Sequence, residues 1–247
     1  MSRSLPVVRA YWLAEVPYRR AWDLQRSLVE AVRAGRHPGA LLLLEHAHVF
    51  TIGRRGDGST LLWSADECAR RGVEVVWTDR GGDATYHGPG QLVGYPIVDL
   101  EKLGSDILRH IRDLETSLVS YLGSLGLESE PGPPGMTGVW SGGAKVAAIG
   151  VKLNRTVTSH GFALNLTTDL DIFNTGIVPC GLVGKRATSV LELGGPRLMV
   201  EEAAKDYLEH FSSTFAVELE PAEIAELEAL PTPEASSSRP GAPLPIL

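Results

Sequence analysis

The feature that most constrains the fold is a series of short apolar segments with only a few residues between them. Residues 40–45 (ALLLLE) and 48–53 (HVFTIG) predict two strands in close succession, and residues 145–153 and 160–166 predict two more. Such short turns leave no room for a crossover helix within each pair. Because helices and strands are still interspersed along the chain, we expect an α/β fold built on a mixed sheet and not a regular βαβ winding.

Helical periodicity marks several segments between the strands. Apolar residues recur at helical spacing over 17–34, and Gly35 is placed to end that helix. Ser64 and Glu67 form a capping box for a short helix that ends near Gly72. Further helices are predicted over 105–125 and 200–215 and from Pro221 onward, further strands over 73–78 and 91–100, and loops over 79–90 and 130–138.

The length and composition favour one domain followed by a tail. The chain has 247 residues, of which 43% are hydrophobic and 21% charged, so a packed core is expected. Its last 17 residues contain five prolines and three serines and too few apolar side chains for a core. We therefore predict a single domain over 1–230 and a disordered tail over 231–247.

The same sequence indicates a cytoplasmic protein. No apolar run approaches the roughly 18–20 residues that a membrane span requires. The first residues lack an apolar segment followed by a small-residue cleavage site, so no signal peptide is expected. Two cysteines, Cys68 and Cys180, are too few for a disulfide framework, which favours a reducing compartment.

The charge distribution argues against a nucleic-acid partner. The net charge is −7, and residues 201–247 hold ten acids and only two bases. The remainder of the chain is nearly neutral, and its basic residues form short pairs such as Arg54-Arg55 and Lys185-Arg186. A nucleic-acid binder would show a large basic region. Most of these pairs are therefore interpreted as solvated surface.

The most unusual stretch runs from Arg80 to Pro96 (RGGDATYHGPGQLVGYP). Its glycines allow the backbone to approach a ligand closely or to adopt positive φ. Arg80 and His87 frame this turn and could bind an oxyanion or a carbonyl. The segment is neither a dinucleotide-binding motif nor a Walker loop. We expect a binding site here; the alternative is an ordinary loop with a hydrogen-bonded histidine.

Cys180 lies in the second distinctive segment, TGIVPCGLVG. Pro179 and Gly181 flank it and favour a sharp bend that would expose the thiol. Cys68 falls inside a predicted helix and is interpreted as a packing residue, which is the commoner fate of a single cysteine. The two cysteines are 112 residues apart and have no metal-ligand spacing, so no metal site is expected.

Lys145 and His160 each begin an apolar strand. An ammonium at Lys145 could stabilise a thiolate, although a solvated lysine at a strand end is the simpler interpretation. His160 leads the segment HGFALN and, taken alone, is interpreted as a core histidine.

Together these segments resemble the lipoyl(octanoyl) transferase family, whose signature has the form R-G-G-x-x-T-aromatic-H-x-x-G-Q-x-V-x-Y. LLLLEHAHVFTIGR, TGVW, KVAAIG, HGFALN and IVPCG follow in the family's order, and the resemblance runs from about Ala10 to Phe215. Ala47 stands where proline is common in the family. The positions of this chain that match the signature are Arg80, Gly81, Gly82, Thr85, Tyr86, His87, Gly90, Gln91, Val93 and Tyr95.

The resemblance implies the mixed-sheet α/β fold that this family shares with the catalytic domains of biotin and lipoate protein ligases. It implies that Cys180 is the acyl-thioester nucleophile and that Lys145 lowers the pKa of its thiol. It also implies an acyl pocket formed by Arg80, Gly81, Gly82, Asp83, Ala84, Thr85, Tyr86, His87, Ala148, Ile149, Gly150, Gly161, Phe162 and Ala163.

The implied reaction transfers an octanoyl group from octanoyl-acyl carrier protein to a lysine of a lipoyl domain, the first step of endogenous protein lipoylation. The expected acceptors are the lipoyl domains of 2-oxoacid dehydrogenase complexes and the glycine cleavage H protein. A thioester donor makes amide formation downhill, so neither ATP nor a cofactor is required. A free thiol of pKa about 8.5 is only a few per cent ionised at pH 7, and a nearby ammonium raises that fraction.

Both protein partners are usually acidic in this family, so we expect Arg54, Arg55, Lys185 and Arg186 to form a basic rim around the site. Three alternatives remain open. An ATP-dependent lipoate or biotin ligase would have the same fold but no cysteine nucleophile. A non-catalytic binder of acyl carrier protein or lipoyl domains would tolerate loss of Cys180. A thiol hydrolase would use Cys180 with His87 or His160.

Overall fold

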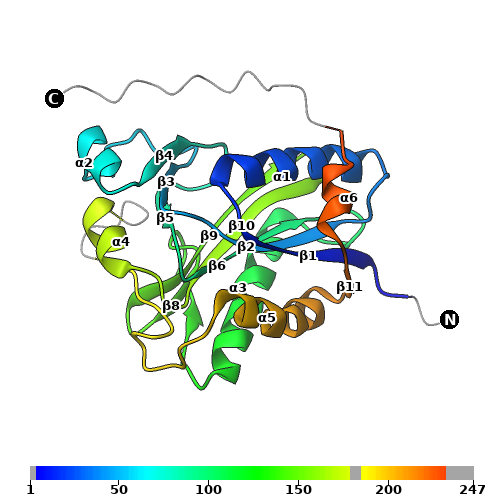
Figure 1. Ribbon diagram of the computed structural model, residues 1–247. Coiled ribbons are helices and arrows are strands. Elements are labelled where there is room, and N and C mark those ends of the chain that lie inside the picture. Colours follow the sequence, from blue (N-terminus) through cyan, green and yellow to red (C-terminus); the bar gives the residue numbers. More distant parts are fainter. Residues whose placement is uncertain (1–3, 179–184, 232–247) are drawn as a thin grey trace.

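Two β-sheets organise the protein. A computed structural model describes residues 4–178 and 185–231. An eight-stranded sheet has the order β11-β1-β2-β6-β10-β9-β8-β7, and a three-stranded sheet has the order β4-β3-β5 (Figure 1). The larger sheet contains β1 (Val7–Glu15), β2 (Ala40–Glu45), β6 (Gln91–Ile97), β7 (Glu130–Pro131), β8 (Val139–Ser141), β9 (Ala144–Asn154), β10 (Val157–Asn165) and β11 (Glu218–Pro221); the smaller contains β3 (Val49–Ile52), β4 (Glu74–Trp77) and β5 (Ala84–His87).

The large sheet is mixed, as the sequence predicted. Strands β11, β1 and β2 are parallel, and every pairing from β2 through β6, β10, β9 and β8 to β7 is antiparallel. The long hairpin of β9 and β10 pairs Gly150 with Gly161 and Ala148 with Ala163. This register brings small residues from two strands to one place in the sheet.

Helices cover both faces of the large sheet (Figure 1). The helices are α1 (Tyr18–Arg33), α2 (Ala65–Arg70), α3 (Ile107–Ser124), α4 (Leu170–Gly176), α5 (Val200–Phe215) and α6 (Ile224–Glu228). Helix α1 packs against β10 and β6 on one face, while α3 and α5 pack together on the other. The Ser64 hydroxyl accepts a hydrogen bond from the Glu67 backbone N–H at 3.2 Å and caps α2 as predicted.

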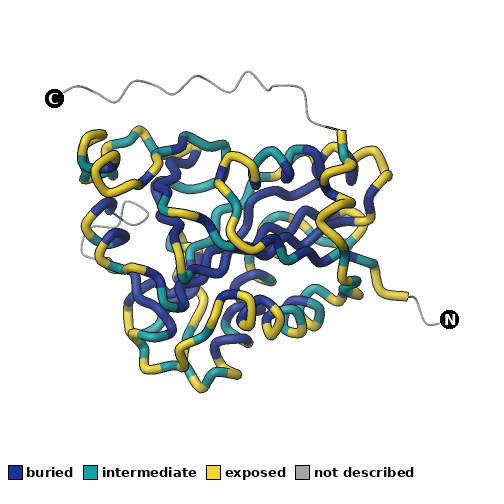
Figure 2. Tube along the Cα trace, viewed as in Figure 1, coloured by how far each residue is buried: buried dark blue, intermediate teal, exposed yellow. Residues whose placement is uncertain are grey.

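The apolar run of β2 explains how both faces are filled. Leu41 and Leu43 belong to the core beneath α3 and α5, whereas Leu42 and Leu44 belong to the core beneath α1. A strand covered on both faces needs apolar residues at successive positions instead of an alternating pattern. Figure 2 shows the consequence: the central strands are buried, and the exposed residues lie in the outer turns and on the outer helix faces.

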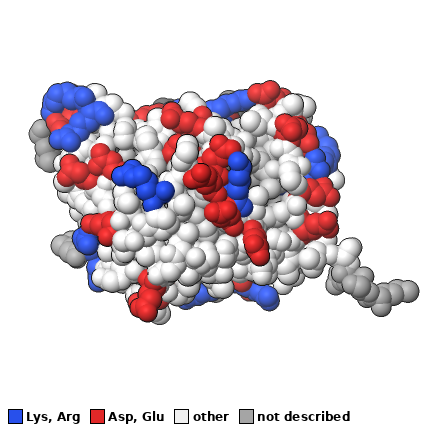
Figure 3. Space-filling view, turned by 60° about the horizontal axis from the view of Figure 1, so that its bottom comes forward, with Lys and Arg blue, Asp and Glu red and all other residues white. Residues whose placement is uncertain are grey.

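The face of the molecule shown in Figure 3 does not present one dominant sign of charge. Basic and acidic side chains are interspersed on the face shown in Figure 3, with uncharged surface between them. Among the described residues, none of the helices combines the length and the apolar character needed to cross a membrane.

Three predicted segments differ in the structure. The segment 130–138, predicted as a loop, begins with β7, which pairs antiparallel with β8. The segment 79–90, predicted as a loop, contains β5, because Ala84–His87 pairs antiparallel with β3. Pro221, predicted to begin the last helix, ends the edge strand β11 instead, and α6 begins three residues later. Proline is tolerated at this edge because the missing N–H removes no bond of a central ladder. Residues 232–247 of the predicted tail 231–247 lie outside the described residues.

Candidate active site

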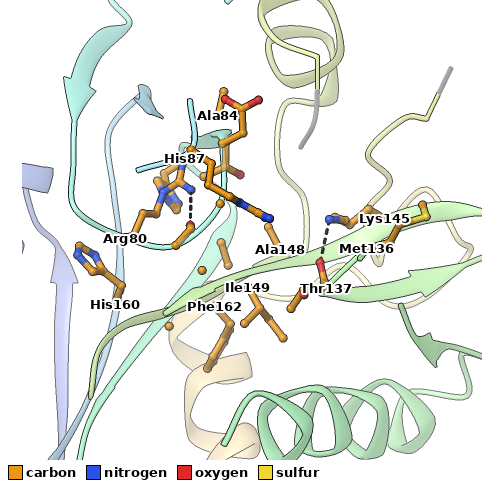
Figure 4. Close-up of a pocket in the computed structure, with 18 of the residues that line it drawn as sticks. Arg80, Ala84, His87, Met136, Thr137, Lys145, Ala148, Ile149, His160 and Phe162 are labelled. Atoms are coloured by element: carbon orange, nitrogen blue, oxygen red, sulfur yellow. Dashed lines mark hydrogen bonds between the residues drawn. The ribbon is translucent and has the colours of Figure 1, made fainter. Parts of the chain in front are cut away.

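One cavity brings together most of the residues that the sequence analysis singled out (Figure 4). Its empty volume is about 690 Å³, including the open space at its mouth. All of the predicted pocket residues except Tyr86 line it, and so does Lys145. Tyr18, Tyr95, His160 and the segment 135–137 also contribute, although the sequence analysis assigned them no role in the pocket.

Strands β9 and β10 form one wall of the cavity. Ala148, Ile149 and Gly150 of β9 lie opposite residues 161–163 of β10. Most of these side chains are small or absent, so the wall leaves space for an elongated apolar group. The sequence prediction named these positions, and the structure brings them to the same cavity.

The glycines of the Arg80–Gly82 turn allow it to lie directly on β9. The Gly81 N–H donates to the Val151 carbonyl at 3.1 Å. A Cβ built at Gly150 would lie 2.8 Å from the Gly81 carbonyl oxygen, and one built at Gly81 would lie 2.8 Å from the Val151 oxygen. Such distances are too short for any side chain. The two glycines therefore permit a backbone contact between two segments that both line the cavity.

The Arg80 guanidinium is buried and fixes this turn from within. Its Nε donates to the Thr51 hydroxyl at 3.0 Å, and its Nη2 donates to the Thr51 carbonyl at 2.5 Å. Its Nη1 donates to the Gly81 carbonyl at 3.0 Å. Arg80 thus connects the turn to β3 while also contributing to the cavity lining.

His87 lies on the lining and is held by a hydrogen-bond chain. Its Nδ1 lies 2.9 Å from the Gln91 amide oxygen, and the Gln91 amide nitrogen donates to the Asn165 oxygen at 2.8 Å. Burial lowers the pKa of His87 well below its usual value, and the nearby His46 ring lowers it further. His87 is therefore neutral at pH 7.

Tyr86 departs from the expectation that it lines the pocket. Its side chain packs with Phe50 and Phe173 in the core beside the small sheet, and its hydroxyl lies 2.6 Å from His48 Nδ1. Adjacent residues of a strand point to opposite faces. Because His87 faces the cavity, its neighbour Tyr86 faces the core behind that wall.

His160, interpreted from sequence as a core histidine, is buried but also lines the cavity. Its Nε2 lies 2.8 Å from Asp79 Oδ1, and Lys152 Nζ donates to Asp79 Oδ2 at 2.6 Å. Burial alone would raise the pKa of Asp79, but the hydrogen bonds from His160 and Lys152 outweigh it and hold that pKa below its usual range. His160 has a φ of 58° and donates its backbone N–H to Gln25 of α1 at 2.7 Å. No local sequence pattern indicated this network.

Lys145 lies at the other end of the cavity and is only 3% exposed. Its Nζ donates to the Thr137 carbonyl at 2.9 Å (Figure 4) and lies 5.0 Å from the centre of the Trp140 ring. Its backbone N–H donates to the Arg186 carbonyl at 3.0 Å. The simpler interpretation of Lys145, a solvated lysine at a strand end, is therefore wrong, because the side chain is buried and lines the cavity.

Cys180 lies outside the described residues, as do Pro179 and Gly181. The chain on both sides of this segment is described. The Val178 N–H donates to the Thr60 carbonyl at 2.8 Å, and Ala187 forms a parallel bridge with Lys145. The ammonium of Lys185 lies 5.9 Å from the Trp140 ring that Lys145 also approaches. Cys68 is buried in α2, as predicted for a packing residue, and burial raises the pKa of its thiol.

The four residues of the expected basic rim are exposed. Arg55 lines the cavity, and Lys185 lies beside Trp140. Arg186 forms an ion pair with Glu192 at 2.9 Å, which offsets part of its charge. Within residues 4–178 and 185–231, no group of three or more His, Cys, Asp or Glu side chains is placed to hold a metal ion.

Comparison with solved structures identifies the fold. Lipoate-protein ligase A in its ATP-bound crystal structure matches with a TM-score of 0.72 and 20% identity, covering 89% of this chain and 90% of that one. The putative lipoate protein ligase Ta0514 of T. acidophilum, with bound lipoic acid, matches with a TM-score of 0.70 and 20% identity over 89% and 90% of the two chains. The architecture is that of the lipoate ligase catalytic domain, as the sequence analysis expected.

Sequence comparison places the chain more narrowly. The model of the lipoyl protein ligase A/B catalytic domain matches residues 17–212. The octanoyltransferase of Solibacter usitatus is 46% identical over 85% of this chain and 93% of that relative. The octanoyltransferase of Rubrobacter xylanophilus is 50% identical over 72% and 80% of the respective chains. The chain belongs to the octanoyltransferase family and is an acyltransferase.

Proposed function

We propose that this protein transfers an octanoyl group from octanoyl-acyl carrier protein to a lysine of a lipoyl domain, through a thioester on Cys180. The curated relatives carry the name octanoyltransferase, which supports the acyl group and the reaction class. The acyl-carrier donor, the lipoyl-domain acceptor and the thioester on Cys180 are what the family resemblance implies, and the chemistry of the site is compatible with them.

The observation that carries the proposal is the position of Lys145 in the cavity. A buried ammonium at one end of a pocket with small-residue walls can stabilise a thiolate and leave room for an acyl chain. Lys185 follows Cys180 by only five positions in the sequence, and its ammonium lies beside the Trp140 ring that the Lys145 ammonium also approaches. This proximity of Lys185 to Lys145 supports Cys180 as the nucleophile that Lys145 serves.

The chemistry proceeds in two half-reactions. The Cys180 thiolate attacks the donor carbonyl and forms a new thioester as the bond from the carbonyl carbon to the carrier sulfur breaks. The departing carrier thiolate takes a proton from the Lys145 ammonium and leaves as a thiol, so Lys145 becomes neutral. The acceptor lysine amine then attacks the acyl-enzyme, an amide forms, and the Cys180 thiolate leaves. A neutral Lys145 can accept the proton of the incoming amine. Exchanging one thioester for another keeps the acyl group activated, so the reaction needs no nucleotide.

The pocket provides a basis for chain-length preference. Each methylene buried from water contributes roughly 0.8 kcal/mol, so an acyl chain that fills the apolar wall binds more tightly than a shorter one. An eight-carbon chain spans about 9 Å, given C–C bonds of about 1.5 Å. The β9 wall from Lys145 to Gly150 spans about 16 Å at roughly 3.3 Å per residue, which accommodates that length.

An intact-mass experiment tests the proposal. The full chain is incubated with octanoyl-acyl carrier protein, weighed, and digested to map any adduct. We expect one octanoyl group on Cys180, removed when a lipoyl domain is added and recovered as an amide on that domain. Cys180→Ser should abolish the thioester adduct and turnover, whereas Cys68→Ser serves as the matched control and should retain both.

Other outcomes identify the alternatives. An octanoyl-adenylate formed from ATP, magnesium and octanoate, without any cysteine adduct, would indicate a ligase. Free octanoate accumulating without amide product would indicate a hydrolase. Binding of acyl carrier protein or lipoyl domain that is unchanged in Cys180→Ser, with no turnover by the wild-type protein, would indicate a binding protein.

A further inference from the structure

Helix α3 contains a buried carboxylate close to the Lys145 end of the cavity. Glu115 is 1% exposed. Its Oε1 accepts a hydrogen bond from the Gly138 N–H at 3.0 Å, and its Oε2 accepts one from Arg112 Nη1 at 2.7 Å. Burying a carboxylate costs free energy unless its hydrogen bonds compensate for the lost hydration. The hydrogen bonds of Glu115 therefore indicate its role. One of these contacts is to the backbone of the segment that holds Lys145.

The peptide unit between Thr137 and Gly138 joins Glu115 to Lys145. Its N–H donates to Glu115, and its carbonyl accepts from Lys145 Nζ at 2.9 Å. A trans peptide is planar, and its N–H and C=O point in opposite directions. Fixing the N–H toward Glu115 therefore fixes the carbonyl toward Lys145. A negative charge on the N–H side also polarises the peptide and strengthens the carbonyl as an acceptor.

Gly138 also packs directly on the stem of Lys145. Its φ is 129°, and a Cβ built there would lie 2.5 Å from the Ala147 carbonyl oxygen and 3.4 Å from Lys145 Cε. The peptide is thus confined between Glu115 on α3 and strand β9. Rotating it would move the carbonyl away from Lys145 and press the backbone against that strand.

From these contacts we infer that Glu115 is a positioning residue for catalysis, acting on the Lys145 ammonium through the Thr137–Gly138 peptide. It is not part of the cavity lining. It holds the carbonyl that orients the ammonium toward the cavity. This inference rests on the proposed role of Lys145 and adds the residue that sets its geometry.

Two conservative substitutions of Glu115 distinguish the effect of its hydrogen bond to Gly138 from the effect of its negative charge. Glu115→Gln keeps an oxygen acceptor at the same distance but removes the charge, whereas Glu115→Asp keeps the charge but is one methylene too short to reach Gly138. Misplacing a catalytic group by about 1 Å can cost 10²-fold, so we expect kcat of Glu115→Asp to fall about 10- to 100-fold. The donor KM should change less than about threefold, because the apolar wall is untouched.

Glu115→Gln should retain kcat within about threefold of wild type, because its amide oxygen still orients the peptide. Arg112→Gln is the matched control: it removes the other partner of Glu115, at a side chain 59% exposed, and leaves the Gly138 contact in place. It should behave like wild type. Rates are normalised to folded protein from circular dichroism and thermal melting, so a loss of folded molecules does not count as a loss of kcat.

A double-mutant cycle with Lys145→Met completes the test. If Glu115 acts through the ammonium, Glu115→Asp should change the single-turnover acylation rate of Lys145→Met by less than about twofold. If the two substitutions instead lower the acylation rate of the double variant by the product of their separate effects, the inference is overturned. It is also overturned if Glu115→Asp retains activity while Glu115→Gln loses it. A wild-type rate in Lys145→Met would instead refute the proposed role of the lysine, so the two failures are distinguishable.

Discussion

Lys145 and Lys152 lie on the same strand, β9, and differ in what holds their ammonium groups. Lys152 donates to the Asp79 carboxylate at 2.6 Å and is part of a network with His160. Lys145 donates to a peptide carbonyl at 2.9 Å and lies over an indole ring. The two lysines are seven residues apart, about 23 Å at roughly 3.3 Å per residue, and they lie near opposite ends of the cavity.

The difference shows how one strand can contain two buried or half-buried lysines with separate roles. The Lys152 ammonium is paired with the Asp79 carboxylate, which also lies 2.8 Å from His160 of the cavity lining. The carbonyl that orients Lys145 is a neutral acceptor, so this contact leaves the positive charge able to stabilise an anion in the cavity. In the proposed mechanism, the chemistry belongs to the Lys145 end of β9, and the Lys152 end contributes structure.

The largest expected effect comes from removing each ammonium in turn. Methionine keeps the length and apolar character of the lysine stem. Lys145→Met should lower kcat by about 10²- to 10⁴-fold, the range expected for loss of a group that transfers a proton or stabilises a nucleophile. Lys152→Met should retain kcat within about fivefold, since its role is structural. Steady-state transfer from octanoyl-acyl carrier protein measures kcat of both variants. An equal loss of kcat in the two variants would show that the Lys145 and Lys152 ends of β9 do not differ in role.

An intermediate effect is expected at Gly150, between the two lysines. A Cβ there would lie 2.8 Å from the Gly81 carbonyl oxygen, so Gly150→Ala must displace the Arg80–Gly82 turn that lines the cavity. Overpacking of this kind costs about 1–3 kcal/mol, and we expect a raised donor KM and a shift toward shorter acyl chains.

Gly123→Ala is the matched control, because a Cβ at that position in α3 meets no atom within 4 Å. It should leave both KM and chain-length preference unchanged. KM values measured for hexanoyl, octanoyl and decanoyl donors test the pair. An unaltered preference in Gly150→Ala would show that the contact between the turn and β9 does not limit the pocket.

The smallest expected effect is a change in the free energy of unfolding when Asp79, the partner of Lys152, is replaced. Hydrogen bonds from His160 and Lys152 hold the pKa of Asp79 below its unfolded value, so the ionised carboxylate stabilises the fold. This contribution is complete above the unfolded pKa of about 3.9 and is lost as the pH falls through the lower folded value. Because water screens a side chain that is 36% exposed, Asp79→Asn should lower the free energy of unfolding by about 1–2 kcal/mol at pH 7.

Urea unfolding at pH 7, 5 and 3 measures this difference. The gap between wild type and Asp79→Asn should remain constant from pH 7 to 5 and narrow by pH 3. A gap that persists unchanged in acid would mean that the carboxyl contributes by packing and not by its charge.

The sequence was sufficient for elements whose signal is local. The run at 40–45 predicted a buried strand because each residue faces a core, and Ser64 predicted a helix start because its hydroxyl caps the next turn. The pocket glycines were also predictable, because the family signature marks positions where the backbone must approach another chain segment.

The remaining features depend on residues far apart in the chain. Asp79 meets His160 across 81 positions, and Glu115 reaches Gly138 across 23. Nothing in the local pattern around His160 or Glu115 distinguishes them from a core histidine or a helix-surface acid. Likewise, Pro221 has the local pattern of a helix start, and only pairing with β1 makes it the end of a strand.

The pairing of β11 with β1 has a consequence for the order of folding. Val7–Ala10 lie beside Glu218–Pro221 in parallel register, so this contact closes a loop that spans most of the chain. Strands β9 and β10 of the cavity wall are hairpin neighbours, and their pairing closes only a short turn. Because the entropy lost on closing a loop grows with its length, that wall can form before the β11 edge of the sheet is complete.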